Sequence, residues 1–438
     1  MVIGDVLLST ANTRRQFLKQ SAFSAAGLWL AGRRGIAQSF AANEKLGIAI
    51  VGVSGQGAYS VGNLADQAIV ALCDVDENRA AETRKRFPKA RFYTDFRKMF
   101  DASSKDFEAV VVATPDHTHA PATMMALKAD KHVYCEKPLT HTVYEARMIA
   151  ETARKRKRVT QMGTQIHAGD NYRRVVELIQ KNTIGPVTEV HVWCPSVWAG
   201  GDRPKDTPPV PAGLHWDEWL GPAPVRPYHP AYAPAGWRGY WDFGGGGLAD
   251  MACHYMDLPT WALDLRHPQV VETEGPPVND EHAPDQIVVR WEHPARKDKP
   301  PVKLTWYGGV DKPAPDIVAR IPKWGVGVLF VGEKGMLIAD YDRHQLLPER
   351  EWTGFKPPEP FIPNSIGHHK EWVEACKKGG PTTCNFDYSG ALTEAVLLGN
   401  VAYRSGKRIE WDAEKMRIAN APEAEKFLRR EYREGWTL

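Results

Sequence analysis

The sequence predicts an α/β protein of two domains, the first of which is built on a doubly wound parallel sheet. Short apolar runs alternate with helix-length segments from residue 46 to residue 163, and a glycine-rich turn directly follows the first run. Continuous apolar strands separated by helices are typical of a parallel sheet that is covered on both faces. The length of 438 residues leaves room for a second domain, at about 100–200 residues for each.

The strands expected in the first domain are each followed by a segment that suits a helix. Because ligands of such sheets bind outside the carboxyl ends of the strands, the residues just after each strand are the first place to look for a site. The strands are expected at residues 47–51, 69–73, 91–93, 109–113, 132–135 and near 159–162.

The first expected strand leads into the stretch GVSGQG at residues 52–57, which resembles the G-x-G-x-x-G turn of dinucleotide-binding domains. In that turn Gly52 makes the tight bend and Gly57 lets helix and strand pack closely. Ser54 stands where a second glycine lets the backbone approach the pyrophosphate, and Gly55 beside it can take over that approach. All four residues are therefore predicted to bind a cofactor.

An acidic residue, Asp74, follows the second expected strand, 22 residues after Gly52. A carboxylate at this place binds the ribose hydroxyls of NAD and repels the 2′-phosphate of NADP. NAD is therefore the predicted cofactor and NADP the less favoured one, although Arg79 lies close by in the sequence.

Two further strand ends point to the same edge of the sheet. The strand at 109–113 is followed by TPDHTH at 114–119, and the strand at 132–135 is followed by Glu-Lys-Pro at 136–138. The Lys137 ammonium is expected where the nicotinamide and the substrate meet. The predicted cofactor contacts from these two turns are Thr114, Pro115, His119, Glu136 and Lys137.

A second motif, downstream of a run of four glycines at 244–247, carries Asp250 and His254. Their spacing of four residues places both on one face of an expected helix. A neutral histidine with a pKa of about 6.5 can take the proton of an alcohol while its carbon loses hydride. We therefore predict that Lys137, Asp250 and His254 are catalytic. The alternative is a structural histidine on a helix whose acid is placed for the helix dipole.

Residues 1–42 are predicted to be a twin-arginine (Tat) export signal. Arg14 and Arg15 are followed by Phe-Leu-Lys, an apolar run at 21–32 and small residues at 37–42. The run is shorter than the roughly 20 apolar residues that span a bilayer. The expected location is the periplasm, and the mature protein is not expected to bind a membrane.

Charge and cysteine content narrow the function classes further. Residues 1–42 carry a net charge of +4 and the whole chain +3, which leaves about −1 for the remainder. A near-neutral protein gives no reason to expect nucleic acid as a partner. The six cysteines show no metal-ligand spacing, so no metal site is predicted. An oxidising compartment permits a Cys376–Cys384 bridge, which the sequence leaves open.

In their order and spacing, these motifs resemble those of the glucose–fructose oxidoreductase/inositol dehydrogenase (Gfo/Idh/MocA) family. The resemblance continues through HKEW at 369–372 and LLGNVA at 397–402, so it covers essentially the whole chain after the signal. Three features depart from the family pattern. They are Ser54, Asp116 where many members have Asn, and a long stretch from 194 to 241 that is rich in Pro, Trp and Tyr.

The resemblance implies an organisation for the whole chain. A Rossmann domain is expected at 43–163, and a C-terminal α/β domain with a large open, mainly antiparallel sheet at 164–438. Members commonly associate through that sheet, so a homo-dimer or homo-tetramer is expected. A Tat-exported bacterial subgroup exists, and it acts mostly on sugars and glycosides.

The substrate is expected at the junction of the two domains. Gln165, His167 and Tyr172 follow the last strand of the first domain and are predicted to line that junction. Aromatic residues of the 194–241 stretch suit the apolar faces of sugar rings, although core packing explains most tryptophans equally well.

Three functions remain open at this stage. The leading interpretation is an NAD(P)-dependent oxidoreductase acting on a ring hydroxyl or ketone of a sugar, inositol or glycoside. The second is a redox-neutral, NAD-dependent glycosidase or epimerase that works through a transient keto-sugar. The third is a non-catalytic NAD-binding sensor, which the presence of Lys137, Asp250 and His254 disfavours.

Overall fold

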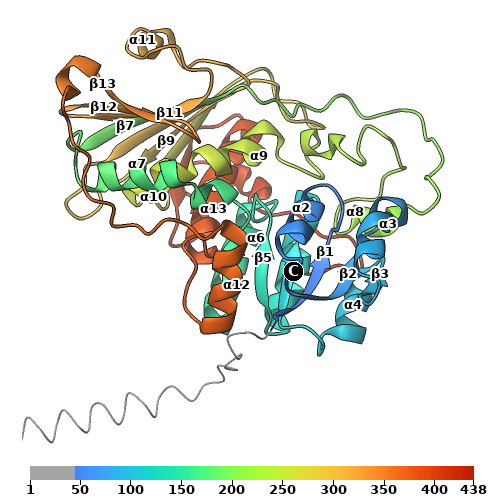
Figure 1. The fold of residues 1–438 in the computed structure, drawn as a ribbon. Helices are drawn as coiled ribbons and strands as arrows, with labels where there is room; N and C mark the ends of the chain where they lie inside the picture. Colours follow the sequence, from blue (N-terminus) through green and yellow to red (C-terminus); the bar gives the residue numbers. More distant parts are fainter. Residues whose placement is uncertain (1–44) are drawn as a thin grey trace, which may run out of the picture.

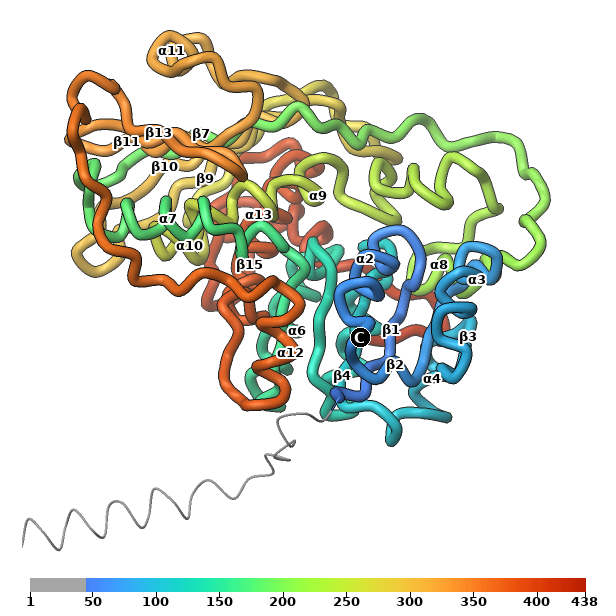
Figure 2. Tube along the Cα trace, viewed as in Figure 1, coloured from blue at the N-terminus to red at the C-terminus, as the bar shows by residue number. Residues whose placement is uncertain are grey.

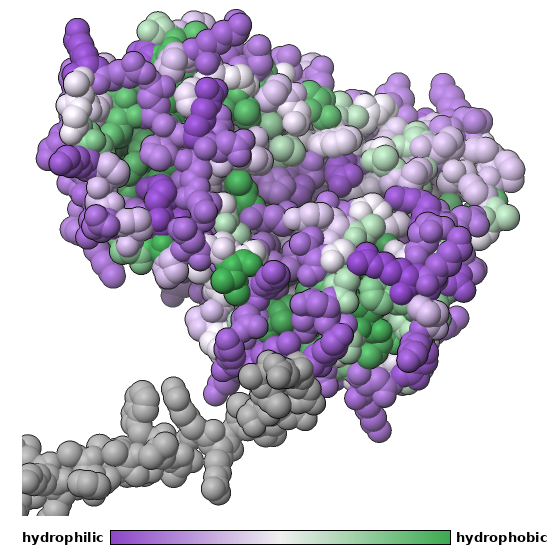
Figure 3. All heavy atoms as spheres, in the orientation of Figure 1, coloured by the Kyte–Doolittle hydropathy of each residue, from purple (hydrophilic) through white to green (hydrophobic). Residues whose placement is uncertain are grey.

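A computed structural model of the chain describes residues 45–438, which form two lobes (Figure 1). The predicted export signal at residues 1–42 lies outside the described residues. No helix between residues 45 and 438 is both long enough and apolar enough to cross a membrane. The face seen in Figure 3 is mainly hydrophilic, with hydrophobic residues in small separate patches.

The first lobe is built on a six-stranded parallel sheet. Its strands are β1 (Gly47–Val51), β2 (Ala68–Cys73), β3 (Arg91–Tyr93), β4 (Ala109–Val112), β5 (His132–Cys135) and β6 (Thr160–Met162). Their order is β3-β2-β1-β4-β5-β6, so the direction of winding reverses between β1 and β4. Both of these central strands are buried along their whole length, as expected for apolar strands covered on both faces. The predicted doubly wound sheet is confirmed.

Five helices cover this sheet. They are α2 (Gln56–Asn63), α3 (Glu77–Arg86), α4 (Phe96–Ser103), α5 (Asp116–Lys128) and α6 (Val143–Arg156). The Asp76 carboxylate accepts hydrogen bonds from the first amides of α3. Thr142 and Glu145 form a capping box at the start of α6. These caps determine where the turns after β2 and β5 end, and both turns carry predicted site residues.

The second lobe contains a nine-stranded sheet. Its strands are β7 (Val187–Cys194), β8 (Val270–Glu274), β9 (Ile287–His293), β10 (Val302–Gly308), β11 (Gly327–Gly332), β12 (Gly335–Ala339), β13 (His344–Leu347), β14 (Ile409–Asp412) and β15 (Arg417–Ile418). The order is β13-β12-β11-β7-β10-β9-β8-β14-β15, and β7 with β10 is the parallel pair. The prediction of a large, mainly antiparallel sheet is confirmed.

Some helices of the second lobe cover one face of this sheet, and others, at residues 216–220 and 368–378, lie beside the first lobe (Figure 1). The α-helices are α7 (Asp170–Gln180), α8 (Trp216–Leu220), α9 (Gly246–Tyr255), α10 (Asp257–Leu263), α11 (Pro315–Val318), α12 (His368–Lys378) and α13 (Phe386–Ser405). Single 3₁₀ turns are η1 (Gln165–Ala168), η2 (Gly236–Gly239), η3 (Glu349–Trp352) and η4 (Pro422–Phe427). The long helix α13 packs against α6 of the first lobe and α9 of the second, so it joins the two lobes.

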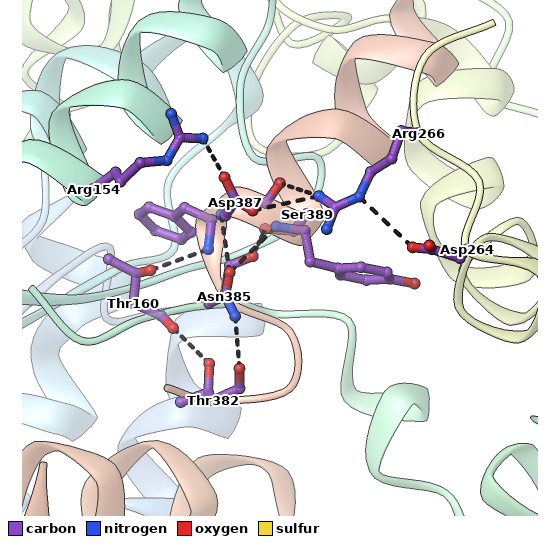
Figure 4. A network of polar contacts seen from close by, with 10 residues as sticks. Arg154, Thr160, Asp264, Arg266, Thr382, Asn385, Asp387 and Ser389 are labelled. Carbon is purple, nitrogen blue, oxygen red and sulfur yellow. Dashed lines mark hydrogen bonds and ion pairs between the residues drawn. The ribbon is translucent and has the colours of Figure 1, made fainter. Parts of the chain in front are cut away.

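The start of α13 is hydrogen-bonded to the edge of the first sheet (Figure 4). The Asn385 side chain caps the helix by accepting from the amide of Asp387 at 3.0 Å. The Thr160 hydroxyl accepts from the amide of Phe386 at 3.0 Å, and its carbonyl accepts from the Thr382 hydroxyl at 2.7 Å. The last strand of the first lobe thus holds the helix that spans both lobes.

Between β7 and α9 the chain makes a long excursion over the first lobe (Figures 1 and 2). We call residues 211–219 of this excursion the strap. The His215 amide donates to the carbonyl of Val75 at 2.8 Å, and the Glu77 amide donates to the carbonyl of Gly213 at 2.9 Å. Residues of the second lobe therefore pair with the backbone that follows β2.

Candidate functional site

The glycine turn between β1 and α2 forms the floor of the site. Gly52 has a φ of +82°, and a Cβ there would lie 2.5 Å from the carbonyl oxygen of Ala113. A Cβ on Gly57 would lie 1.9 Å from the carbonyl oxygen of Gly52, so neither position accepts a side chain. The turn leaves the N-terminus of α2 open to a ligand, and such a helix end suits a pyrophosphate. The predicted nucleotide fits this cradle.

Asp74 faces the glycine turn from the end of β2. Its Oδ2 accepts from the Val53 amide at 3.0 Å and from the Ser54 hydroxyl at 3.1 Å, and its Oδ1 accepts from the Asp76 amide at 3.0 Å. Burial raises the pKa of Asp74, while these donors and the charge of Arg79 oppose that rise. Ser54, which replaces the second glycine, therefore fixes the carboxylate that is expected to bind the ribose.

A cavity of about 400 Å³ runs from the glycine turn along the edge of the sheet. Residues of both lobes line it, because the strap and the residues after it, including Trp219 and Trp237, form the wall opposite the sheet. Six of the predicted cofactor residues line the cavity: Gly52, Ser54, Gly55, Asp74, Thr114 and Pro115.

The His119 ring lies between the turn after β4 and the turn after β5. Its Nδ1 lies 2.7 Å from the carbonyl of Pro138, and its Nε2 lies 2.8 Å from the carbonyl of Thr114. Burial lowers the pKa of His119 to about 4, and the two carbonyls oppose that shift. The ring therefore holds the turn after β4 to the turn after β5, and it does not line the cavity.

Glu136 is buried under the same edge and binds Gln165. The Gln165 Nε2 lies 3.1 Å and 3.2 Å from the two carboxylate oxygens, and Gln56 and Ser60 donate at 3.4 Å. Burial raises the pKa of Glu136 to about 7, with Gln165 and Lys137 as the chief opposing groups. Gln165, predicted as a substrate contact, thus supports the Glu-Lys-Pro turn in this structure.

Lys137 and Asp250 come from different lobes and form an ion pair. The Lys137 ammonium contacts Oδ1 of Asp250 and also donates to its backbone carbonyl at 3.0 Å. Arg238, in η2, donates its Nε to the same Oδ1 at 3.2 Å. Burial by itself raises the pKa of Asp250, but the charges of Lys137 and Arg238 outweigh it and lower the pKa below its ordinary value. Asp250 is therefore a stable anion that holds the lysine in place.

His254 lies one helical turn after Asp250 on α9, as predicted. Its Nδ1 is buried and has no hydrogen-bond partner among residues 45–438. Burial, followed by the charge of Lys137, lowers its pKa to about 3, and Asp250 opposes this. The imidazole is therefore neutral at pH 7, with a pKa below the ordinary value of about 6.5 that the predicted general base would have.

The structure places His167 and Tyr172 in the core of the second lobe, away from the surface of the junction. Both side chains are 0% exposed. The His167 ring faces both carboxylate oxygens of Asp257 at 3.0 Å and stacks on Trp261 at 4.0 Å, and the Tyr172 hydroxyl donates to the carbonyl of His254 at 3.3 Å. Fully buried side chains do not contact a substrate, so the predicted substrate role is corrected to a supporting one beneath α9.

The cysteines are free buried thiols throughout residues 45–438, so Cys376 and Cys384 are not bridged. The ligating atoms of Cys384, His167 and Asp257 lie within 4.8 Å of one another. The Asp257 carboxylate already accepts from the Tyr388 hydroxyl at 2.7 Å and faces the imidazole. Hydrogen bonds therefore satisfy this buried carboxylate, as they do most buried polar groups.

Sequence reasoning missed two ionisable residues of the site, Arg238 and Asp116. Arg238 lines the cavity, binds Asp250 and lies over the ring of Trp237 at 4.2 Å. Asp116 is buried, which raises its pKa to about 8, with Arg238 as the chief opposing charge. The sequence feature that relates to Arg238 is the glycine run at 244–247, which permits a close approach of the two segments. A Cβ on Gly244 would lie 2.7 Å from the Cα of Arg238.

Two family models match the chain. Residues 46–164 match the model described as an oxidoreductase family with an NAD-binding Rossmann fold. Residues 179–293 match the model described as the C-terminal alpha/beta domain of the oxidoreductase family. Together the two matches span more than half of the chain, and they confirm the prediction of an NAD-binding first domain.

Relatives that are named for an activity match only part of this chain and part of their own length. An inositol 2-dehydrogenase of Salmonella typhimurium is 30% identical over 148 residues, which are 32% of this chain and 44% of the relative. A glycosyl hydrolase family 109 protein of Saccharopolyspora erythraea is 30% identical over 212 residues, which are 42% of this chain and 46% of the relative. The chain therefore spans less than half the length of these relatives.

Solved structures share the fold of most of the chain. The aldose-aldose oxidoreductase of Caulobacter crescentus superposes with a TM-score of 0.59 at 18% identity, over 84% of this chain and 100% of that one. The WlbA dehydrogenase of Bordetella pertussis, solved with NADH and UDP-GlcNAcA, has a TM-score of 0.59 at 18% identity, over 84% and 99%. From the two family matches and this shared fold, we conclude that the chain belongs to the Gfo/Idh/MocA oxidoreductase family.

Proposed function

We propose that the chain is an NAD-dependent oxidoreductase that transfers hydride between the nicotinamide and a ring hydroxyl or ketone of a sugar, inositol or glycoside. One observation carries this proposal. The Lys137 ammonium is anchored by Asp250 at the carboxyl edge of the nucleotide-binding sheet, and the neutral His254 lies one turn further along α9.

Each of these residues has a chemical role that follows from its contacts. A lysine ammonium has three N–H donors, and Lys137 uses two of them on the carboxylate and the carbonyl of Asp250. The third is available to the reacting oxygen of the substrate, whose pKa it lowers. His254 accepts the hydroxyl proton, and Asp250 stabilises the imidazolium that forms. When bound, NAD supplies the hydride acceptor.

The names of relatives support this class of substrate. Several relatives are named inositol 2-dehydrogenases, and one solved neighbour is an aldose-aldose oxidoreductase. Asp74 supports NAD over NADP, because its carboxylate would face a 2′-phosphate.

The test uses the purified protein without added nucleotide. We expect mass spectrometry to detect NAD(H) that co-purifies, and a panel of sugars, inositols and glycosides to change the absorbance of the bound reduced nicotinamide. Calorimetry should show tighter binding of NAD than of NADP. A protein that binds neither nucleotide, or that binds NAD but reduces it with no member of the panel, contradicts the proposal.

A redox-neutral glycosidase or epimerase is the second candidate, and two observations favour it. One relative is a glycosyl hydrolase family 109 protein. The strap pairs with the backbone after β2 and covers the nucleotide cavity, which suits a cofactor that stays bound through each cycle. Such an enzyme exchanges the hydrogen next to the transient ketone with solvent. Product formed in deuterium oxide without net NADH, and carrying deuterium at that carbon, would favour this candidate over a net dehydrogenase.

We further propose that residues 1–42 direct export to the periplasm by the twin-arginine route. The support is the Arg14–Arg15 pair with its apolar run. Replacing both arginines by lysine keeps the charge but should leave the precursor in the cytoplasm, because the receptor recognises the arginine pair. Undiminished periplasmic protein in this double variant would contradict the export proposal.

The nine-stranded sheet supports a homo-dimer or homo-tetramer. Val288 and Tyr307 face each other on β9 and β10 and are only half-buried in the single chain. Light scattering after size exclusion should give two or four copies, and Val288→Glu with Tyr307→Glu should give a monomer. A monomeric wild-type protein would rule out this assembly.

A further inference from the structure

A second cavity, of about 660 Å³, lies between the end of α13, the start of α6 and residues 426–431. It shares no lining residue with the nucleotide cavity. Gly244 and Gly245 line it, just before α9 begins with Gly246. The cavity therefore borders the helix that carries Asp250 and His254, but it is separate from the site proposed above.

Unpaired cations dominate the lining of this second cavity. Arg404, Lys426 and Arg429 line it, and none forms an ion pair with any acid among residues 45–438. Of the two acids in the lining, Asp242 is bound to Arg226 at 2.5 Å. The second acid is Glu431, and Arg226 is shared between Asp242 and Glu281, so within the lining itself cations outnumber acids.

The most deeply placed of these cations is Arg404. Its guanidinium carbon lies 4.9 Å from the ring centre of Trp241 and 4.6 Å from that of Phe427. In the described part of the chain, no acceptor lies within hydrogen-bond distance of this guanidinium. Burial lowers the pKa of Arg404, which Asp242 and Asp280 oppose only from a distance. The guanidinium is nonetheless only partly buried, and its N–H donors are accessible to a ligand in the cavity.

A fourth cation, Arg430, and a histidine, His141, also line the cavity. Arg430 binds Glu145 at 3.0 Å, and one of its other nitrogens, Nη1, is buried without a partner among the described residues. The Nδ1 of His141 is likewise buried without a partner in residues 45–438. Burial, followed by the charge of Arg430, lowers the pKa of His141. The ring is therefore neutral at pH 7 and adds no positive charge to the lining.

We propose that this second cavity binds a small dianion of the phosphate class, either the free ion or the phosphoryl group of a small molecule. A guanidinium presents its donors in a fixed fork that matches such an oxyanion. Two aromatic rings hold the fork of Arg404 in place before the ligand arrives, and the excess of cations over acids in the lining favours an anion. Asn400 donates to the carbonyl of Gly245 at 2.9 Å. The ligand would thus contact the segment that positions α9.

The test is calorimetric titration of NAD-saturated protein at low ionic strength, with inorganic phosphate and with glycerol 3-phosphate. Saturating NAD occupies the phosphate-binding turn at Gly52–Gly57, so the heat reports on the second cavity alone. We expect one saturable site. Loss of a charged hydrogen-bonding partner is worth about 1.5–3 kcal/mol, so Arg404→Gln should weaken binding roughly 10–100-fold. Tighter binding of inorganic phosphate would identify the free ion as the ligand. Tighter binding of glycerol 3-phosphate would identify the phosphoryl group of a small molecule.

Two further variants keep the test decisive if Arg404→Gln does not fold. Lys426→Gln with Arg429→Gln alters exposed side chains of the cavity and should weaken binding at least several-fold. Lys89→Gln with Lys98→Gln removes the same net charge from exposed positions of the first lobe and should leave binding unchanged. No saturable binding, equal affinity in the cavity variants, or equal weakening in the control pair would overturn the proposal. The measurement involves no turnover, so it stands apart from the proposed activity.

Discussion

Two buried carboxylates, Asp74 and Asp250, lie on either side of the glycine turn. Neutral hydrogen-bond donors contact the first, and cations contact the second. Uncharged donors hold Asp74: two backbone amides and the hydroxyl of Ser54. Two cations, Lys137 and Arg238, hold Asp250. The pKa of Asp74 is raised because burial prevails, whereas the pKa of Asp250 is lowered because the cations prevail over burial.

This difference shows how one fold can use the same side chain for two tasks. A carboxylate held by neutral donors can exchange one of them for a ribose hydroxyl at little electrostatic cost. A carboxylate held by two cations is fixed as an anion, and it positions the Lys137 ammonium. We therefore expect the end of the site at Asp74 to determine the affinity for the nucleotide. We expect the end of the site at Asp250 to determine the rate of the chemical step.

The largest expected effect tests the Asp250 end through its neighbour His254. His254→Ala should lower kcat by about 10²–10⁴-fold, the usual contribution of a general base, with nearly unchanged affinity for NAD. Single-turnover reduction of the bound nicotinamide measures the step directly. His344→Ala, at an exposed position on β13, is the control and should behave like wild type. A His254→Ala variant that reduces its nicotinamide at the wild-type rate shows that the histidine is structural.

The next effect tests the Asp74 end. Asp74→Asn should weaken NAD binding about 10–100-fold, because a charged acceptor for the ribose hydroxyls is lost. Its kcat at saturating NAD should remain near that of wild type, and its preference for NAD over NADP should shrink. Calorimetry with both nucleotides measures this, with Asp66→Asn, exposed in the same lobe, as the control. A fall in kcat with unchanged affinity would reverse the roles that we assign to the two ends.

A smaller effect is expected from Arg238, which acts through Asp250. Arg238→Gln removes a charge that lowers the pKa of Asp250, so that pKa should rise. We expect kcat/KM to fall about tenfold, as for the loss of one charged hydrogen bond. The acid limb of the pH–rate profile should move to higher pH, and Arg238→Lys should partly restore it. An equal fall at every pH would point to a packing role instead.

The last test measures how the thermal stability of the whole protein changes when the pH is lowered. Burial lowers the pKa of seven histidines to between about 3 and about 4. They are His117, His119, His132, His254, His293, His368 and His369. Between their ordinary pKa of about 6.5 and these values, the unfolded chain binds protons that the folded chain does not, so stability falls as the pH falls.

Asp116 and Glu136 act in the opposite sense, because their folded-state pKa values are raised to about 8 and about 7. They stabilise the fold as the pH falls, as does Asp74, whose pKa is also raised, but the histidines with lowered pKa values outnumber these acids. We therefore expect the Tm to drop by on the order of 10 °C between pH 7.5 and pH 5. Differential scanning calorimetry in buffers of matched ionic strength checks this, and a Tm that rises on acidification would contradict it.

Much of the first lobe could be predicted, because its signals are local. The apolar run at 47–51, the glycine turn and Asp74 each owe their place to residues close by in the sequence. Lys137 and Asp250 were both predicted to be catalytic from their motifs, but the ion pair between them was not predicted.

Other features depend on packing between distant segments. Arg238 reaches Asp250 only because the glycine run lets two backbones meet closely. His167 follows β6 as the prediction assumed, yet its ring turns inward toward Asp257, a residue 90 positions away. Nothing in the sequence around residue 167 specifies that direction.

The strap has a consequence for how the two lobes move. Its backbone hydrogen bonds to residues 75 and 77 cross from one lobe to the other, close to the adenosine side of the nucleotide cavity. A hinge motion that opened the crevice from that side would have to break them together. The amides of Glu77 and His215 should therefore exchange their hydrogens for deuterium as one cooperative unit, at the rate at which the lobes separate. Nucleotide exchange would then be gated by the same opening.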